Sequence, residues 1–204
     1  MTARTLAVVS AGLRVPSSTR LLADQLSSAA GTELDRRGVS VRTEVVELRD
    51  HGHDVVNHML TGFPSTALKQ ALDTVSGADG LIVVTPIFNA SYSGLFKSFF
   101  DVLEDDALVD RPVLIGATGG TARHSLALEH ALRPMFSYLR AVVMPTSVFA
   151  APEDWAGGSA QGTLRRRIDR AVRELADQVA QREPAEAADP FRLTTSFDEL
   201  LTGD

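Results

Sequence analysis

The sequence predicts a doubly wound α/β fold, in which helices cover both faces of a parallel five-stranded sheet. Short apolar runs rich in β-branched residues alternate along the chain with longer stretches whose apolar residues recur at helical spacing. Two of the short runs, residues 81–84 and 113–116, are apolar throughout, as expected of strands that are buried on both faces. The chain has 204 residues, which suits one domain of ordinary size.

The predicted strands and helices alternate regularly. The strands are Thr5–Val9, Val39–Val46, Gly80–Thr85, Pro112–Ala117 and Ala141–Val148. The helices are Thr19–Arg37, Thr66–Ser76, Ser93–Leu103, Ser125–Leu139 and Gln161–Arg182. Ser17 and Ser18 are N-cap candidates for the first helix. Because a helix separates each pair of consecutive strands, the strands should run parallel in the flavodoxin-like order 2-1-3-4-5.

Residues 1–183 are expected to form this one domain. The stretch Glu183–Asp189 is rich in Ala, Pro and acidic residues, which is typical of a linker. The tail, residues 184–204, contains several Phe and Leu residues after that linker. We expect the tail to pack either on the body of the protein or on a neighbouring subunit.

Charge and composition exclude several classes of function. The net charge of −6 argues against nucleic acid as a partner. The Arg-rich stretch 165–173 is interleaved with acidic residues, so we expect a solvated helix face there. The absence of Cys excludes disulfides and Cys-based zinc sites. No window is long and apolar enough for a membrane span, and the N-terminus lacks a signal-peptide pattern, so a cytoplasmic location is expected.

Three loops should meet at the carboxyl ends of the strands, where open α/β sheets bind ligands. The first loop, residues 10–20 (SAGLRVPSSTR), enters a helix with several hydroxyl groups. A helix N-terminus attracts anions, and Arg14 or Arg20 would add a positive charge for a phosphate. The loop matches neither a Walker A nor a Gly-x-Gly-x-x-Gly sequence. The alternative is an ordinary N-cap.

The second and third loops have compositions that suit a flat ring. Residues 85–94 (TPIFNASYSG) combine a Pro, two aromatic residues and hydroxyl groups directly after a buried strand. Residues 118–124 (TGGTARH) contain paired glycines, which let the backbone approach a ligand closely. The alternatives are that Phe88 and Tyr92 are core or interface aromatics, and that the glycines form a simple tight turn.

Several polar clusters carry weaker signals. Asp50, His51, His53, Asp54 and His58 follow the second strand in what we predict to be a loop, and we expect a polar loop near a pocket mouth or interface with no metal. His130 lies in an apolar helix and is expected to be packed or at an interface. His124, beside the third loop, is a weaker candidate for substrate contact. No Gly-x-Ser-x-Gly nucleophile motif is present.

Together the loops resemble the NAD(P)H-dependent FMN reductases of the flavodoxin-like superfamily. The resemblance is strongest to reductases that supply reduced flavin to luciferase-like or alkanesulfonate monooxygenases. It extends from Thr5 to Phe149. The matching stretches are Ser10 with 14–19 (RVPSST), 85–97 (TPIFNASYSGLFK), 117–120 (ATGG) and 128–134 (LEHALRP).

The resemblance implies a role for each loop. The residues implied to hold the FMN phosphate are Ser10, Arg14, Ser17, Ser18 and Thr19. Those implied to line the isoalloxazine are Pro86, Ile87, Phe88, Asn89 and Ser91, with Thr118, Gly119 and Gly120 at its other edge. NAD(P)H would stack on the open ring face and pass a hydride to flavin N5, with no side-chain acid or base required. Backbone N–H groups near Asn89, Gly119 and Gly120 would stabilise the charge that develops on the flavin.

Two departures and several alternatives accompany the resemblance. At the end of the first strand some relatives have Gly-Ser where this chain has Ser10, Ala11 and Gly12, so the position of the phosphate could shift by one residue. Some two-component reductases have Tyr at the position of His130, where it is linked to a helix bulge and to flavin transfer. The alternatives are a quinone or azo reductase with tightly bound FMN, a flavodoxin-like electron carrier, and a flavin-free module.

A homodimer or homotetramer is expected, both from the resemblance and because Phe96, Phe99 and Phe100 offer more aromatic surface than one helix usually hides. The sequence does not choose between NADH and NADPH.

Overall fold

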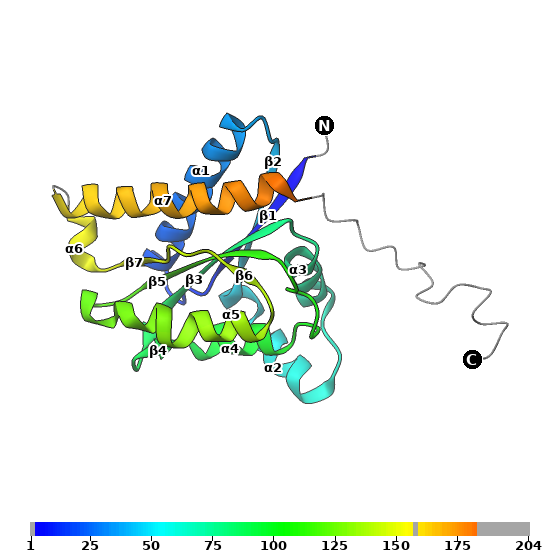
Figure 1. Ribbon diagram of the computed structural model, residues 1–204. Helices are drawn as coiled ribbons and strands as arrows, with labels where there is room; N and C mark the ends of the chain where they lie inside the picture. The colour runs from blue at the N-terminus through cyan, green and yellow to red at the C-terminus, as the bar shows by residue number, and fades with distance from the viewer. Residues whose placement is uncertain (1–2, 157–158, 183–204) are drawn as a thin grey trace.

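The computed structural model describes residues 3–156 and 159–182, which form a sheet between two layers of helices (Figure 1). Helices α1 (Ser18–Arg36) and α7 (Ser159–Gln181) lie side by side on one face. Helices α3 (Thr66–Ser76), α4 (Gly94–Asp101) and α5 (Arg133–Tyr138) cover the other face. No helix in these described ranges is long and apolar enough to cross a membrane. The tail, residues 184–204, lies outside the described residues.

The sheet has the strand order β2-β1-β3-β5-β6, which confirms the predicted order. The main parallel strands are β1 (Arg4–Ser10), β2 (Val41–Glu47), β3 (Gly80–Phe88) and β5 (Pro112–Thr118). A short strand, β4 (Ser91–Tyr92), pairs antiparallel with the end of β3. The described residues therefore form seven strands in place of the predicted five.

The last predicted strand, Ala141–Val148, is divided into two. Strands β6 (Val142–Val143) and β7 (Val148–Ala150) both pair with β5. Pro145 lies between them and has no N–H group for a ladder hydrogen bond. The Arg133 guanidinium instead donates hydrogen bonds to the carbonyl oxygens of Met144 and Pro145, at 3.0 and 3.1 Å. These contacts explain why one strand becomes two.

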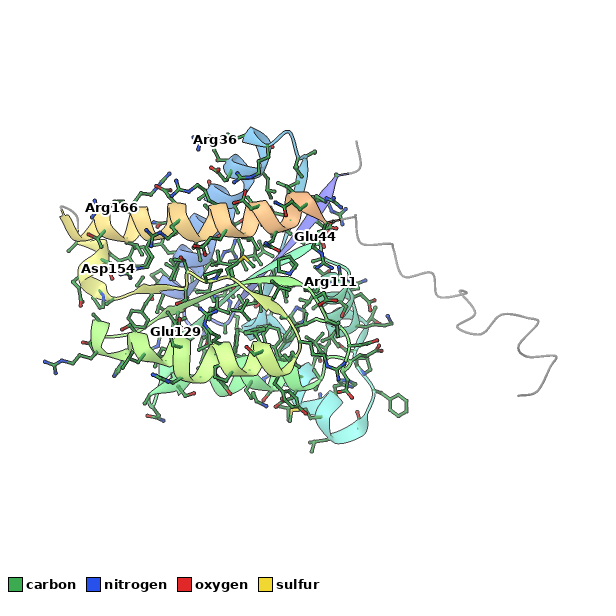
Figure 2. The ribbon with its side chains drawn as sticks, in the orientation of Figure 1. Arg36, Glu44, Arg111, Glu129, Asp154 and Arg166 are labelled. Carbon is green, nitrogen blue, oxygen red and sulfur yellow. The ribbon has the colours of Figure 1, made fainter. Side chains whose placement is uncertain are left out.

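Local capping explains why the helices begin where they do. The hydroxyls of Ser17, Ser65 and Ser93 accept hydrogen bonds from backbone amides in the first turns of α1, α3 and α4. Each helix then buries an apolar stripe. Leu22, Leu26 and Leu34 of α1 share a core with α7, whose buried residues are Leu164, Ile168, Ala171, Val172, Leu175, Ala176 and Val179. The Arg-rich stretch of α7 is exposed, as Arg166 illustrates in Figure 2, so the predicted solvated face is confirmed.

The segment after β2 is helical, so the predicted loop there is wrong. A 3-10 turn, η1 (Leu48–His51), leads into α2 (Gly52–Thr61). The helix ends at Gly62, whose φ of 78° is a left-handed C-cap. The helix lacks the regular spacing of buried apolar residues that marks a helix in a sequence. It buries only Val55 and leaves Val56, Met59 and Leu60 exposed.

The predicted helix Ser125–Leu139 is helical as far as Tyr138, but it is not one regular α-helix, because this stretch consists of three parts. These are a 3-10 turn η2 (Ala122–Leu126), a π-helical turn η3 (Leu128–Leu132) and α5. The Arg133 amide bonds to the Leu128 carbonyl five residues earlier. Pro134 follows and has no N–H group, so it cannot continue a regular α-helical ladder at this point. Figure 2 labels Glu129 in this turn; its carboxylate accepts hydrogen bonds from Arg133 and from Ser147.

The aromatic residues of α4 lie in the core. Phe96 and Phe99 are fully buried, and Phe100 is 3% exposed. The Phe100 ring packs edge-to-face on Phe136 of α5, with ring centroids 5.0 Å apart. These phenylalanines therefore do not offer the exposed aromatic surface that the sequence suggested, because they pack within the subunit.

Candidate functional site

The three predicted loops meet at one edge of the sheet. In the strand register, Ser10 lies opposite Glu47 on one side and Val84 on the other. Pro86, two residues before the end of β3, lies opposite Thr118 at the end of β5. Because all these strands are parallel, their carboxyl ends and the loops that follow them share that edge.

Two hydrogen bonds join the loops directly. The buried hydroxyls of Thr19 and Thr118 lie 2.8 Å apart and connect the start of α1 with the end of β5. The Ala11 amide donates to the Val84 carbonyl at 2.9 Å, which holds the first loop against β3. The structure thus brings together the three segments that the sequence singled out.

The first loop folds tightly over the N-terminus of α1. A Cβ atom on Gly12 would lie only 2.0 Å from the Ser17 hydroxyl, so a larger residue here would have to displace the side chain that caps α1. Ser17 is half-buried, while Arg14 and Ser18 are exposed. The exposed hydroxyl and guanidinium therefore stand beside the positive end of the helix dipole.

Arg20, which the sequence suggested as a positive charge for a phosphate, is already paired with acidic side chains. Its Nε donates to Asp24 at 2.7 Å and its Nη1 to Glu47 at 2.5 Å. The hydrogen bond to Asp24, and next the one to Glu47, raise the pKa of Arg20 above its ordinary value. Of the two candidate cations, Arg14 is the one that remains exposed without such a pairing among the hydrogen bonds of the described residues.

Ser10 provides the sharpest test of whether the site fits an anionic ligand. The residue is fully buried at the end of β1, and its hydroxyl has no hydrogen-bond partner within the described part of the chain. Buried hydroxyls are nearly always paired, so an orphaned one at a strand end indicates a missing partner. A phosphate at the N-terminus of α1 is a partner of suitable chemistry.

The second loop is a tight hairpin. Strand β3 continues to Phe88, and Ile87 and Phe88 pair with Tyr92 and Ser91. Asn89 and Ala90 form the turn with φ of 48° and 68°, the signs of a type I′ turn. Pro86 and Ile87 are buried, whereas Phe88 is 48% exposed.

The hairpin is fixed to the helix that follows it. The Thr85 hydroxyl accepts a hydrogen bond from the Ser93 amide at 3.1 Å and donates to the Pro86 carbonyl at 3.0 Å. Ser93 in turn caps α4. The second loop therefore presents the exposed ring of Phe88 from a rigid base, and sequence reasoning missed the hairpin because the turn has no Gly.

The two glycines of the third loop differ in their surroundings. The Gly119 amide donates to the Ala150 carbonyl at 3.2 Å, and a Cβ atom on Gly119 would lie 2.8 Å from Cζ of Phe149. Gly120 is exposed, and a Cβ atom there would meet nothing within 4 Å. Gly119 is thus required by packing on Phe149, whereas Gly120 faces open space. Sequence reasoning missed the part that Phe149 plays here.

The histidines occupy different places. His124 is exposed beside the third loop. His130 is exposed on the π-helical turn, so the packed alternative is wrong, and it lines a groove of about 480 Å³ between α4 and α5 with Tyr92, Tyr138 and other residues. Of the remaining histidines, His51 ends η1 and is half-buried, while α2 carries the exposed His53 and the half-buried His58. Among the described residues, no group of three or more His, Asp or Glu could hold a metal ion.

Comparison with known proteins identifies the family. The family model for NADPH-dependent FMN reductases matches residues 4–156, which include all three loops. The chain belongs to this family. The resemblance seen in the sequence is therefore confirmed, and with it an oxidoreductase activity that uses FMN and NAD(P)H.

Individual relatives of this FMN reductase cover most of its length. An FMN reductase (NADPH) of Pseudomonas aeruginosa is 37% identical over 147 residues, which are 72% of this chain and 76% of that protein. An NADH-dependent FMN reductase, SfnE of Pseudomonas putida, is 36% identical over 148 residues, 72% of this chain and 77% of that one. An oxidoreductase from Corynebacterium diphtheriae has a crystal structure with 48% identity and a TM-score of 0.87, covering 90% of this chain and 100% of that one.

Proposed function

We propose that this FMN reductase binds FMN across the three loops and reduces it with NADH or NADPH. The observation that carries the proposal is the convergence of the loops at one sheet edge, joined by the Thr19–Thr118 hydrogen bond. Bound FMN supplies the hydride-accepting chemistry, and the protein supplies position and charge. Relatives of nearly equal identity are named for NADPH and for NADH, so both nicotinamides belong in the assay.

The first loop would hold the phosphate. The hydroxyls of Ser10, Ser17, Ser18 and Thr19 and the guanidinium of Arg14 are the proposed donors. The dipole of α1 adds to their attraction for an anion. The orphaned hydroxyl of Ser10 would gain a partner, and exposed Arg14 would contribute a charge-assisted hydrogen bond.

The other two loops would hold the ring. Pro86, Ile87, Phe88, Asn89 and Ser91 would line one side, and Thr118, Gly119 and Gly120 the other. Because the Gly119 amide already donates to Ala150, the exposed Gly120 is the better candidate for a backbone donor to the ring edge. The open face of the site would admit the nicotinamide.

We further propose that reduced FMN leaves this cytoplasmic enzyme for a partner monooxygenase. Support comes from the resemblance to reductases that supply such enzymes.

A homodimer or homotetramer is also proposed. The groove between α4 and α5 supports this, since apolar and aromatic residues line most of it, beside Lys97, Asp101 and His130, and Tyr138 there is 86% exposed. Tyr138→Asp should lower the assembly state in analytical ultracentrifugation, and an unchanged state would remove this face from the interface.

The activity itself is tested with the purified full-length chain. NADH and NADPH oxidation is measured with and without added FMN, and then with a quinone or an azo dye as final acceptor. A reductase that releases its product should depend on added FMN and show saturation in it. A protein that is yellow as purified and reduces quinone without added FMN would instead support the quinone reductase alternative. A chain that neither binds FMN nor oxidises NAD(P)H would refute the proposal.

A further inference from the structure

An acidic side chain stands next to the proposed phosphate site. Glu47 ends β2 directly opposite Ser10, and its side chain is only 13% exposed. Its carboxylate accepts a hydrogen bond from Arg20, which lies in the first turn of α1. Asp24, one helical turn further on and 51% exposed, accepts a second one.

This arrangement places negative charge beside the proposed phosphate site. The N-terminus of a helix favours anions and disfavours cations, so an Arg in the first turn is unfavourable there unless a negative group lies close to it. Here the guanidinium meets two carboxylates of the protein itself at 2.5 and 2.7 Å. Two carboxylates against one guanidinium leave one excess negative charge beside a site proposed for a phosphate dianion.

We infer that Glu47 withholds Arg20 from the FMN phosphate and thereby weakens the binding of FMN. This inference rests on the proposed function, because it takes the phosphate to lie at the N-terminus of α1. The inference gives a function to the pairing of Arg20 with acidic side chains. An enzyme that passes reduced FMN to a second protein needs to release it, and a phosphate held without Arg20 leaves more readily.

Glu47 and Asp24 differ in ways that assign the effect to Glu47. Glu47 is held at the end of β2 by its pairing with β1 and is mostly buried, whereas Asp24 is an exposed i, i+4 partner on the same helix as Arg20. Exposed i, i+4 pairs contribute little and rearrange easily. Asp24 therefore serves as a matched control, since it carries the same charge and contacts the same guanidinium.

The experiment compares the dissociation constants of FMN and riboflavin, which differ by the phosphate alone. In Glu47→Gln, FMN should bind about 3- to 10-fold more tightly, which is the scale of one screened charge interaction near a protein surface. Riboflavin affinity should stay the same. Asp24→Asn should change FMN affinity less, because Glu47 still holds Arg20. Adding Arg20→Gln to Glu47→Gln should abolish most of the gain.

The possible results separate this inference from the proposed function. Unchanged or weaker FMN binding in Glu47→Gln, or equal tightening of riboflavin, would overturn the inference while leaving the enzyme an FMN reductase. A wild-type chain that binds no FMN would overturn both. If Glu47→Gln does not fold, Glu47→Asp takes its place, because the shorter side chain loosens the contact with Arg20 and should also tighten FMN relative to riboflavin.

Discussion

The hydroxyl oxygens of Thr19 and Thr118 lie 2.8 Å apart inside the protein, although 99 residues separate them in the sequence. This hydrogen bond connects the first turn of α1 to the last residue of β5. It therefore sets the distance between the loop proposed to hold the phosphate and the loop proposed to hold one edge of the ring.

Replacing Thr19 with Val keeps the side-chain shape and removes the hydroxyl. A buried hydroxyl left without its partner costs about 1–3 kcal/mol, so Thr19→Val should lower the free energy of unfolding by about that amount. Urea unfolding measures the change. Thr32→Val in the same helix is the control: its hydroxyl is exposed, and its replacement should stay within about 0.5 kcal/mol. An equal loss in both variants would show that the Thr19–Thr118 hydrogen bond stabilises the fold no more than an exposed threonine hydroxyl does.

Ala90 carries backbone strain in the second loop. Its φ of 68° lies in the left-handed region, which costs a non-glycine residue about 1 kcal/mol. Ala90→Gly should therefore raise the melting temperature, with a gain of about 0.5–1 kcal/mol in the free energy of unfolding. The same substitution at Ala29, in the middle of α1, should instead lower stability by a similar amount. A loss of stability in Ala90→Gly would contradict the hairpin geometry.

The paired glycines of the third loop should respond differently to a methyl group. In Gly119→Ala the new Cβ atom would lie 2.8 Å from the Phe149 ring, so the loop must shift. We expect weaker FMN binding and a lower melting temperature. Gly120→Ala meets open space and should keep the melting temperature of the wild type. Equal melting temperatures for the two variants would rule out Phe149 as the reason for Gly119.

Features with a local physical cause were predictable from the sequence. The predicted helix 66–76 matches α3, and the first helix is placed within one residue, because Ser17 and Ser65 are readable N-caps ahead of clear apolar stripes. The strand order followed from the alternation of strands and helices. The loops that form the candidate site were recognised because polar, aromatic and Gly-rich loops follow buried strands.

Features that depend on tertiary contacts were not predictable. The pairing of Arg20 with Glu47 needs the register of β2 against β1 and the position of α1, so Arg20 remained a phosphate candidate in the sequence. The hairpin at 88–91 has Ala where such turns usually have Gly. The π-helical turn before Pro134 depends on one displaced backbone hydrogen bond, which leaves no mark in the spacing of apolar residues.

The central claim is that the N-terminus of α1 holds the phosphate of FMN, and titration of the purified chain with FMN and riboflavin tests it most directly. The wild type should bind FMN at least about 10-fold more tightly than riboflavin, the scale expected for a few charge-assisted hydrogen bonds. Ser17→Asp combined with Ser18→Asp should abolish that difference by repelling the phosphate. Equal affinity of the wild type for the two flavins, or an unchanged preference for FMN in the double variant, would contradict the account.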